Sequence, residues 1–374
     1  MTPQRLTPEQ AIARLPSVAG YALTHNHFAV ILADANNGRS NRIAVVEWAK
    51  DGQGRPMPDR DYAASLTLTL AKSGLATNSD VQAILVGYGP RGKNRVDELT
   101  EMLHQGGFTW EYIGAHVDDN EVRFKFEKEG LWNEPTPLPD VSAELVYEGK
   151  QLPAQTRNEY KARFAPEASP LFHQVSDLEA ARFNKQSPRA QVEESLFHLS
   201  ALSEGTGDRS EHMAKLAHGI LHSDVVRDCV YIEAAKSDRA TDSLIHTYQA
   251  SPSNLRGELA PVAATCAYLN YKPLPVVEAI TAHTTPEGRN ARLGQLVLGV
   301  AKTGTHPGTV RQTLHAVAFA ELDKAQKAFE RSQRLSTAFP QQQSPGLKAS
   351  KGEATRSRSS INQSRSTERD GRLF

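Results

Sequence analysis

Cysteine is scarce in this sequence of 374 residues, and it contains no long apolar run. The two cysteines, Cys229 and Cys266, lie inside apolar helical patterns, which excludes a disulfide framework and a four-cysteine zinc site. The first residues lack the apolar core of a signal peptide, and no window approaches the roughly 18 uninterrupted apolar residues of a membrane-spanning helix. We therefore expect a cytoplasmic protein without a membrane segment.

An excess of charge of one sign is also missing, because 43 acidic residues balance 43 basic residues. The overall charge therefore favours neither general nucleic-acid binding nor the attraction of an anionic substrate. The length is enough for two ordinary domains of roughly 100–200 residues each, with additional segments.

Residues 1–135 are predicted to form a mixed α/β domain, because apolar runs typical of strands alternate with segments of helical periodicity. Strands are predicted at residues 28–32, 42–48, 81–86, 112–116 and 122–126, and helices at residues 62–75 and 97–103. The last two strands are predicted to pair across Asp118, Asp119 and Asn120, which are residues that turns favour. These acids, together with Glu121, could alternatively bind a divalent cation. The element order predicts one sheet with helices packed on it, followed by a connecting segment at residues 136–186.

Residues 187–332 carry sets of apolar residues at helical spacing, separated by breakers such as Ser223-Asp224 and Thr285-Pro286-Glu287. Every second helix start is spaced by roughly 30 to 36 residues, near the period of tetratricopeptide repeats, although their consensus is absent. We predict an all-helical, tetratricopeptide-like array of antiparallel hairpins that leaves one curved side free.

Residues 333–374 are predicted to be a disordered, basic Ser/Arg tail. After Phe339 the composition shifts to Pro-Gln-Gln-Gln-Ser-Pro and then to serine, threonine, arginine and lysine. So few apolar residues cannot offset the entropy lost on ordering the chain. Such a tail could contact nucleic-acid phosphates, and a purely solvated tail is the alternative.

Several short motifs resemble one known family in their order along the chain. They are Leu15-Pro16 through Gly20-Tyr21, Val146-Tyr147-Glu148-Gly149 with Leu152-Pro153 and Arg157, Val226-Arg227-Asp228, Leu259–Leu269, Val276–Ile280 and Ala291-Arg292-Leu293. Together they resemble an actinobacterial family, also found in phages of those bacteria, that is catalogued as domain of unknown function 4192. The resemblance covers residues 10–320 and implies a shared architecture without assigning catalytic residues.

The clearest candidate for chemistry is the turn Gly87-Tyr88-Gly89-Pro90-Arg91-Gly92-Lys93, which follows a predicted strand. Its Gly-x-Gly-x-x-Gly spacing is typical of loops whose backbone amides hold a phosphate at a helix N-terminus. The candidate residues for binding a nucleotide or another anionic ligand are therefore Gly87, Gly89, Gly92 and Lys93. An ordinary strand-to-helix turn is the alternative, because Pro90 removes one amide donor.

Two further groups of polar residues are predicted to be structural. Arg227 and Asp228, the pair in the family pattern, are expected to form a salt link or cap between helical hairpins. His218 and His222 have a spacing that could chelate a metal, but no glutamate lies between them and no third ligand is evident. We therefore expect no metal and no cofactor.

The predicted architecture favours a non-catalytic protein-interaction or scaffold protein whose partner is another protein, bound on the open side of the helical array. The alternative is an enzyme or sensor that binds an anionic ligand at the turn from Gly87 to Lys93. A second alternative is a nucleic-acid-associated protein that uses its tail. Whether the chain catalyses a reaction stays open at this point.

Overall fold

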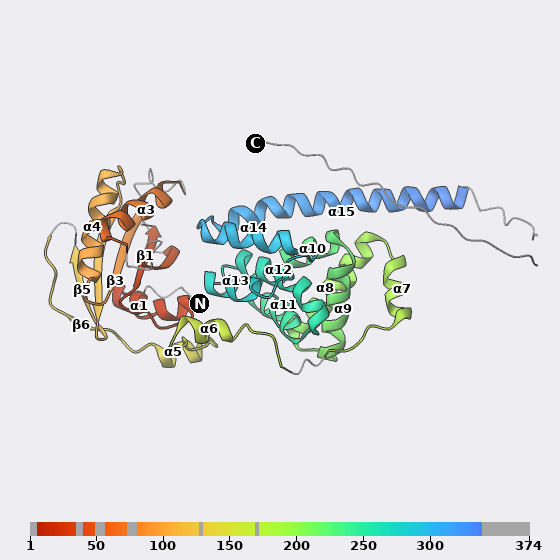
Figure 1. The fold of residues 1–374 in the computed structure, drawn as a ribbon, viewed down its shortest axis with the longest axis horizontal. Coiled ribbons are helices and arrows are strands. Elements are labelled where there is room, and N and C mark those ends of the chain that lie inside the picture. The colour runs from red at the N-terminus through yellow and green to blue at the C-terminus, as the bar shows by residue number, and fades with distance from the viewer. Residues whose placement is uncertain are drawn as a thin grey trace, which may run out of the picture. The chain divides into compact units, whose positions relative to one another are not determined.

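The computed structural model of this chain describes residues 6–34, 40–48, 57–72, 81–126, 130–168 and 172–338. The division into compact units falls between Phe329 and Glu330. The first unit contains a sheet with helices in its N-terminal part and mostly helices after it, as the sequence predicts (Figure 1). Within the described ranges, none of the helices combines the length and the apolar character that crossing a bilayer requires.

The sheet is mixed, and its six strands follow the order β2-β1-β3-β4-β5-β6. The strands are β1 (His27–Asp34), β2 (Ser40–Glu47), β3 (Val81–Tyr88), β4 (Glu111–Asp118), β5 (Glu121–Phe126) and β6 (Thr136–Pro137). Strands β3 and β4 are parallel, with Val86 opposite Ala115, whereas the other neighbouring strands pair antiparallel. The carboxyl ends of β3 and β4 therefore lie at the same edge of the sheet.

Helices cover both faces of the sheet. Helices α3 (Asp59–Lys72) and α4 (Gly92–Gln105) contribute to the apolar core on one face, and α1 (Pro8–Ala13) and α2 (Leu15–Ala19) to that on the other. Along β3, Leu85 faces the first core, whereas Val86 and Tyr88 face the second. Because successive side chains of a strand point to opposite faces, a strand covered on both sides needs a continuous apolar run.

Residues 136–186 connect the sheet to the helical array and contain three short helices, α5 (Ser142–Tyr147), α6 (Arg157–Ala162) and α7 (Asp177–Lys185). The Arg157 guanidinium contacts the carboxylates of both Glu47 and Glu278. This residue of the connecting segment therefore bonds to side chains from β2 and from the helical array.

The predicted helical array is present after residue 187. Its helices are α8 (Pro188–Glu204), α9 (Arg209–His222), α10 (Asp224–Ala234), α11 (Asp238–Ala250), α12 (Ser253–Leu269), α13 (Leu274–Thr281), α14 (Ala291–Lys302) and α15 (Pro307–Ala338). Helix α15 continues past residue 333, the predicted start of the tail, because the alanine, glutamate, glutamine and arginine residues there favour helix. The rest of the predicted tail, residues 339–374, lies outside the described residues.

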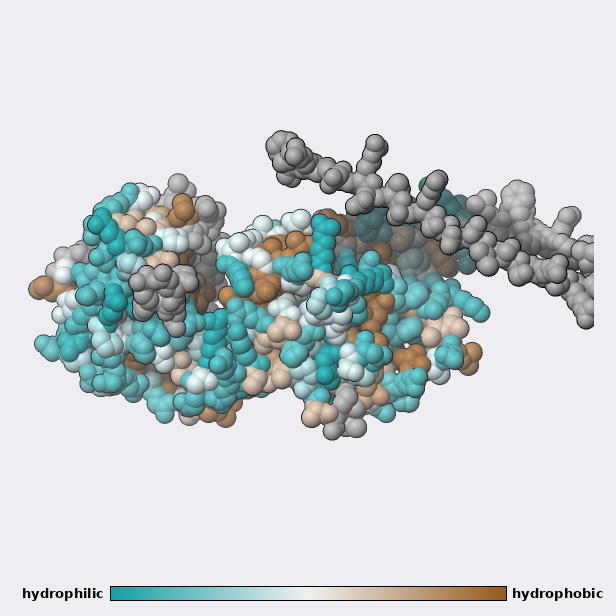
Figure 2. All heavy atoms as spheres, in the orientation of Figure 1, coloured by the Kyte–Doolittle hydropathy of each residue, from teal (hydrophilic) through white to brown (hydrophobic). Residues whose placement is uncertain are grey.

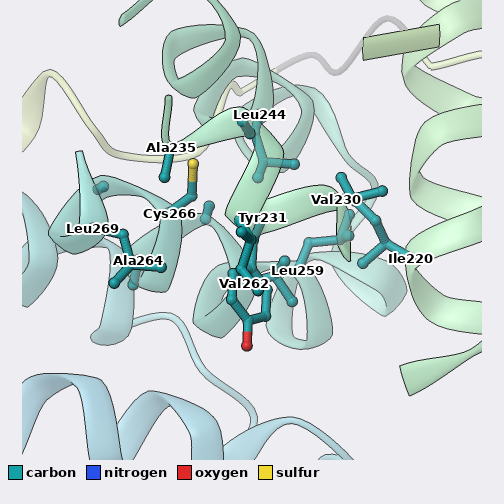
Figure 3. Close-up of a cluster of buried hydrophobic side chains, with 14 of the residues drawn as sticks. Ile220, Val230, Tyr231, Ala235, Leu244, Leu259, Val262, Ala264, Cys266 and Leu269 are labelled. Carbon is teal, nitrogen blue, oxygen red and sulfur yellow. The ribbon is translucent and has the colours of Figure 1, made fainter. Parts of the chain in front are cut away.

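Helix α12 is the centre of the array. Every residue from Leu259 to Leu269 is buried, and α9, α10, α11, α13 and α14 all pack against this helix. Figure 3 shows Ile220 of α9, Tyr231 of α10 and Leu244 of α11 in the cluster that surrounds it. These partners are the helical pairs directly before and after α12 in the sequence, together with its own hairpin partner, as expected when helical pairs stack on their neighbours. The segment Leu259–Leu269 itself contributes almost no exposed surface.

Pro261 lies inside α12 and cannot donate to the carbonyl of Gly257. The backbone N–H of Thr285 donates to this carbonyl instead, at 3.2 Å. A Cβ atom at residue 257 would overlap the Thr285 side chain, so glycine permits this approach. The break in the helical hydrogen bonding thereby anchors the loop that leads to α14.

Candidate functional site

A groove of about 750 Å³ lies at the carboxyl edge of the parallel strands β3 and β4. It is bordered by α1, α2, the loop at residues 22–25, the β4–β5 turn and the segment at residues 138–145, and Figure 1 shows α1 and α5 at this end of the sheet. The polar residues that characterise it are Thr24, His25, Asp118, Asp119, Asn120 and Asp140. We call it the strand-end groove. Ligands of open α/β sheets bind at carboxyl ends of strands, so this is the position where a binding site is expected.

The inner wall of the strand-end groove includes the apolar residues Ile12, Val117 and Leu145, which are themselves almost fully covered by the protein. Tyr88, the last residue of β3, also lines the groove and is 5% exposed. Its hydroxyl has no hydrogen-bond partner in the described part of the chain. Burial raises the pKa of Tyr88, so the hydroxyl stays neutral and keeps its proton to donate.

The acids at the rim are held in defined positions. Asp119 and Asn120 have φ angles of 46° and 64°, and they form the two-residue turn between Asp118 of β4 and Glu121 of β5. The hairpin predicted from the sequence is therefore present, and its turn uses the left-handed conformation that Asp and Asn tolerate. Among the described residues, no three His, Cys, Asp or Glu side chains are close enough together to hold a metal ion.

Asp140 comes from a different part of the chain, just before α5. Its Oδ1 accepts a hydrogen bond from the backbone N–H of Ser142 at 2.9 Å. Hydrogen bonds from Ser142 lower the pKa of Asp140, so this carboxylate is charged at neutral pH. Since no lysine or arginine is among the described residues that line the groove, its charge is negative.

The glycines of the predicted anion-binding turn permit close packing. Gly87 of β3 and Gly92 of α4 approach so closely that a Cβ atom on either would clash with the backbone of the other. Gly89 has a φ angle of 73° and lies against His25. These three positions therefore need glycine for the turn from strand to helix, independently of any ligand.

The hydrogen-bonding groups of this turn bind other parts of the protein. The Gly89 N–H donates to the Val117 carbonyl, and the Gly92 N–H donates to the Gly89 carbonyl, both at 2.8 Å. The Lys93 ammonium lies 5.7 Å from the centroid of the Trp132 ring, an internal cation–π contact. Of the four predicted binding residues, Gly89 alone lines the strand-end groove among the described residues.

The two arginines of the same segment are also engaged within the protein. Arg91 and Arg95 both contact the carboxylate of Asp59, at 2.7 and 3.4 Å. Arg95 is 3% exposed, donates to the His25 carbonyl at 2.6 Å and lies over the Trp48 ring. Burial lowers the pKa of Arg95, yet these partners compensate its charge. Arg95 thus fixes the loop that carries His25 into the groove.

Arg227 and Asp228 lie in a polar network between helices. The Arg227 guanidinium bonds to Asp228 and Asp224 at 2.7 Å each and to Asn290 at 2.6 Å. Glu258 of α12 accepts hydrogen bonds from the backbone amides of Arg289 and Asn290 at 2.9 and 3.0 Å. The network therefore joins α10 and α12 to the N-terminus of α14.

Four histidines lie between α8 and α9. His218 and His222 stack with ring centroids 6.0 Å apart, and His212 contacts His198 with 2.8 Å between their Nδ1 atoms. Burial, followed by the charge of His212, lowers the pKa of His198 to about 4, so the His198 ring is neutral at neutral pH. Nothing in the spacing within the sequence indicates the contact between His198 and His212, because the residues belong to different helices.

No protein-family model matches this chain, and no curated protein or solved structure matches it. The strand-end groove combines an accessible volume with several polar lining residues. Such a combination is what distinguishes a binding site from an ordinary surface depression.

Proposed function

We propose that this chain is a non-catalytic protein-interaction protein and that the strand-end groove receives a segment of its partner. The observation that supports this most is the groove itself, about 750 Å³ in volume, with a polar rim above an apolar wall. Its rim consists of loops and turns positioned by a rigid sheet, the arrangement in which recognition residues commonly occur. Main-chain groups of an extended segment can bond to the rim while an apolar side chain contacts Ile12 and Leu145.

The distribution of exposed apolar side chains favours the strand-end groove as the recognition site over an apolar surface patch. Figure 2 shows hydrophilic residues over most of the visible face. Most large exposed apolar residues occur on separate elements, for example Leu178 on α7, Phe197 on α8 and Leu296 on α14, although Val146 and Tyr147 are adjacent on α5. Single exposed apolar residues are normal on a protein surface and do not by themselves indicate a contact site.

A nucleotide or another anionic ligand at the turn from Gly87 to Lys93 is the less supported function. Two of the amides there already donate within the protein, and Lys93 faces Trp132. The carboxylates of the adjacent groove would also repel a phosphate. Nucleic-acid contact through the tail concerns residues outside the described ranges.

Membership of the family catalogued as domain of unknown function 4192, with its actinobacterial and phage hosts, is part of the proposal. It is supported by the order of the sequence motifs, several of which lie at positions the fold requires, such as the buried segment Leu259–Leu269. A cytoplasmic location is likewise proposed, and the two unpaired buried cysteines are consistent with a reducing compartment.

Selection of peptides from a displayed random library against the immobilised full-length chain tests the proposed function. We expect enriched peptides that bind the protein and lose binding to Ser17→Trp, which fills the groove from α2. The matched control is Ser200→Trp, at an exposed position of α8. Binding that is equal for both variants, or no enrichment at all, would contradict the proposal.

A further inference from the structure

We infer that the strand-end groove selects a peptide segment that carries lysine or arginine, with Asp118, Asp119 and Asp140 receiving its positive charge. This inference rests on the proposed function and names the chemistry of the partner. It predicts a charge preference opposite to that of the anion-binding turn expected from the glycine spacing.

The charge of the groove is not balanced by the cations around it. Asp118, Asp119 and Asp140 line it, and the described lining residues include no lysine or arginine. The neighbouring Arg14 is engaged by Glu144 at 2.7 Å and by Glu148 at 2.8 Å. A ligand cation can therefore meet these carboxylates without displacing an internal ion pair.

The backbone segments that carry the three carboxylates are also fixed before a ligand arrives. The ladder between β4 and β5, in which Val117 faces Val122, fixes the turn that carries Asp118 and Asp119. Asp140 is oriented by its hydrogen bond from the Ser142 N–H. The backbone that carries these side chains therefore does not need to rearrange when a ligand binds, which favours binding by preorganisation.

Tyr88 supplies the observation that distinguishes a peptide from a simple cation. Its buried hydroxyl has no acceptor in the described part of the chain, although buried polar groups are normally hydrogen-bonded. A peptide carbonyl that reaches the inner wall can accept the hydroxyl proton, whereas a protonated polyamine can donate to the hydroxyl oxygen but offers no acceptor for this proton. The groove therefore suits a ligand in which a positive charge and a carbonyl oxygen occur together.

Fluorescence anisotropy with the full-length chain and labelled octalysine and octaglutamate peptides tests the charge preference. We expect octalysine to bind, octaglutamate to remain free, and the affinity to fall when salt rises from about 50 to about 500 mM. The double variant Asp118→Asn/Asp140→Asn should weaken octalysine binding about fivefold or more, as the loss of two exposed ion pairs implies. The matched control, Glu101→Gln/Glu111→Gln, removes two exposed acids that do not line the groove and should leave binding unchanged.

Tyr88→Phe tests the hydroxyl separately from the charge. It should weaken octalysine binding about two- to tenfold, the value of one hydrogen bond, and reduce the competition by spermine less than it reduces octalysine binding. Its melting temperature should not fall, because the lost hydroxyl has no partner within the described chain. Equal octalysine binding by the Asp118/Asp140 variant and its control overturns the inference. If displayed peptides bind the groove but are acidic or neutral, the inference fails while the proposed function stands.

Discussion

Replacing Arg227 by alanine should destabilise the helical array far more than the loss of an ordinary surface charge. The Arg227 side chain is 15% exposed and bonds to Asp224, Asp228 and Asn290. Asn290 is 2% exposed, so its oxygen cannot recover a partner from water when the guanidinium is removed. An unsatisfied buried polar group costs about 1–3 kcal/mol, and with the broken ion pairs we expect a loss of about 3 kcal/mol in the free energy of unfolding.

Urea unfolding followed by far-ultraviolet circular dichroism measures this change, because helices dominate the signal. The matched control is Arg182→Ala, since Arg182 is 62% exposed and pairs with Glu194. An exposed ion pair contributes less than about 1 kcal/mol, so the control should be close to the unmodified protein.

A double-mutant cycle with Asn290→Ala isolates the contact between the two residues. We expect a coupling energy of about 1–2 kcal/mol, because both residues belong to one buried network. If Arg227→Ala costs no more than Arg182→Ala, or the coupling is near zero, the network does not stabilise the start of α14 and our reasoning is refuted.

Three other changes test the packing and the titration of the fold. Gly92→Ala should destabilise the sheet domain by about 1–3 kcal/mol in thermal unfolding, because the new methyl group would overlap the Gly87 carbonyl and the His116 ring. An unchanged stability would show that β3 and α4 can move apart at this position. The pKa of His198 is lowered to about 4 in the folded protein, so between about pH 6.5 and pH 4 the unfolded chain binds more protons than the folded chain. The stabilising contribution of neutral His198 is therefore complete above about pH 6.5 and is lost as the pH falls towards 4. In His198→Gln, the slope of the unfolding free energy against pH should decrease by the equivalent of about one proton. An identical pH profile in this variant would contradict the assignment to His198. Burial raises the pKa of Cys229 to about 11 and that of Cys266 to about 12. Both thiols should therefore react with a thiol reagent only after unfolding, and labelling of the native protein would show that α10 and α12 open.

Much of the fold could be predicted because its periodicities are unambiguous. Strand β3 is apolar from Ala83 to Val86, since Leu85 and Val86 face different cores, and that run stands out in the sequence. Helices after residue 187 are separated by capping residues such as Ser187 and Asp208, whose side chains accept from the first turn. The enclosure of α12 was not predictable, because periodicity shows that a helix has apolar faces and not how many neighbours cover them.

The candidate site was much less predictable than the fold. Ile12, His25, Tyr88, Asp118 and Asp140 meet in one groove although they come from five separate segments. The glycine pattern indicated phosphate binding, but the same three glycines are required wherever a strand and a helix approach this closely. Spacing alone cannot tell these two requirements apart, and the use of the amides within the protein becomes visible only in three dimensions.

The central place of α12 has a consequence for how the protein is made. A chain that has been synthesised only to residue 252 contains α8 to α11 but not the helix on which α9, α10 and α11 pack. These helices also pack on one another, but the apolar faces that α9, α10 and α11 turn towards α12 have no final partner until Ser253–Leu269 has left the ribosome. Removing residues from Ser253 onward should therefore destabilise the preceding helices as well as shorten the array.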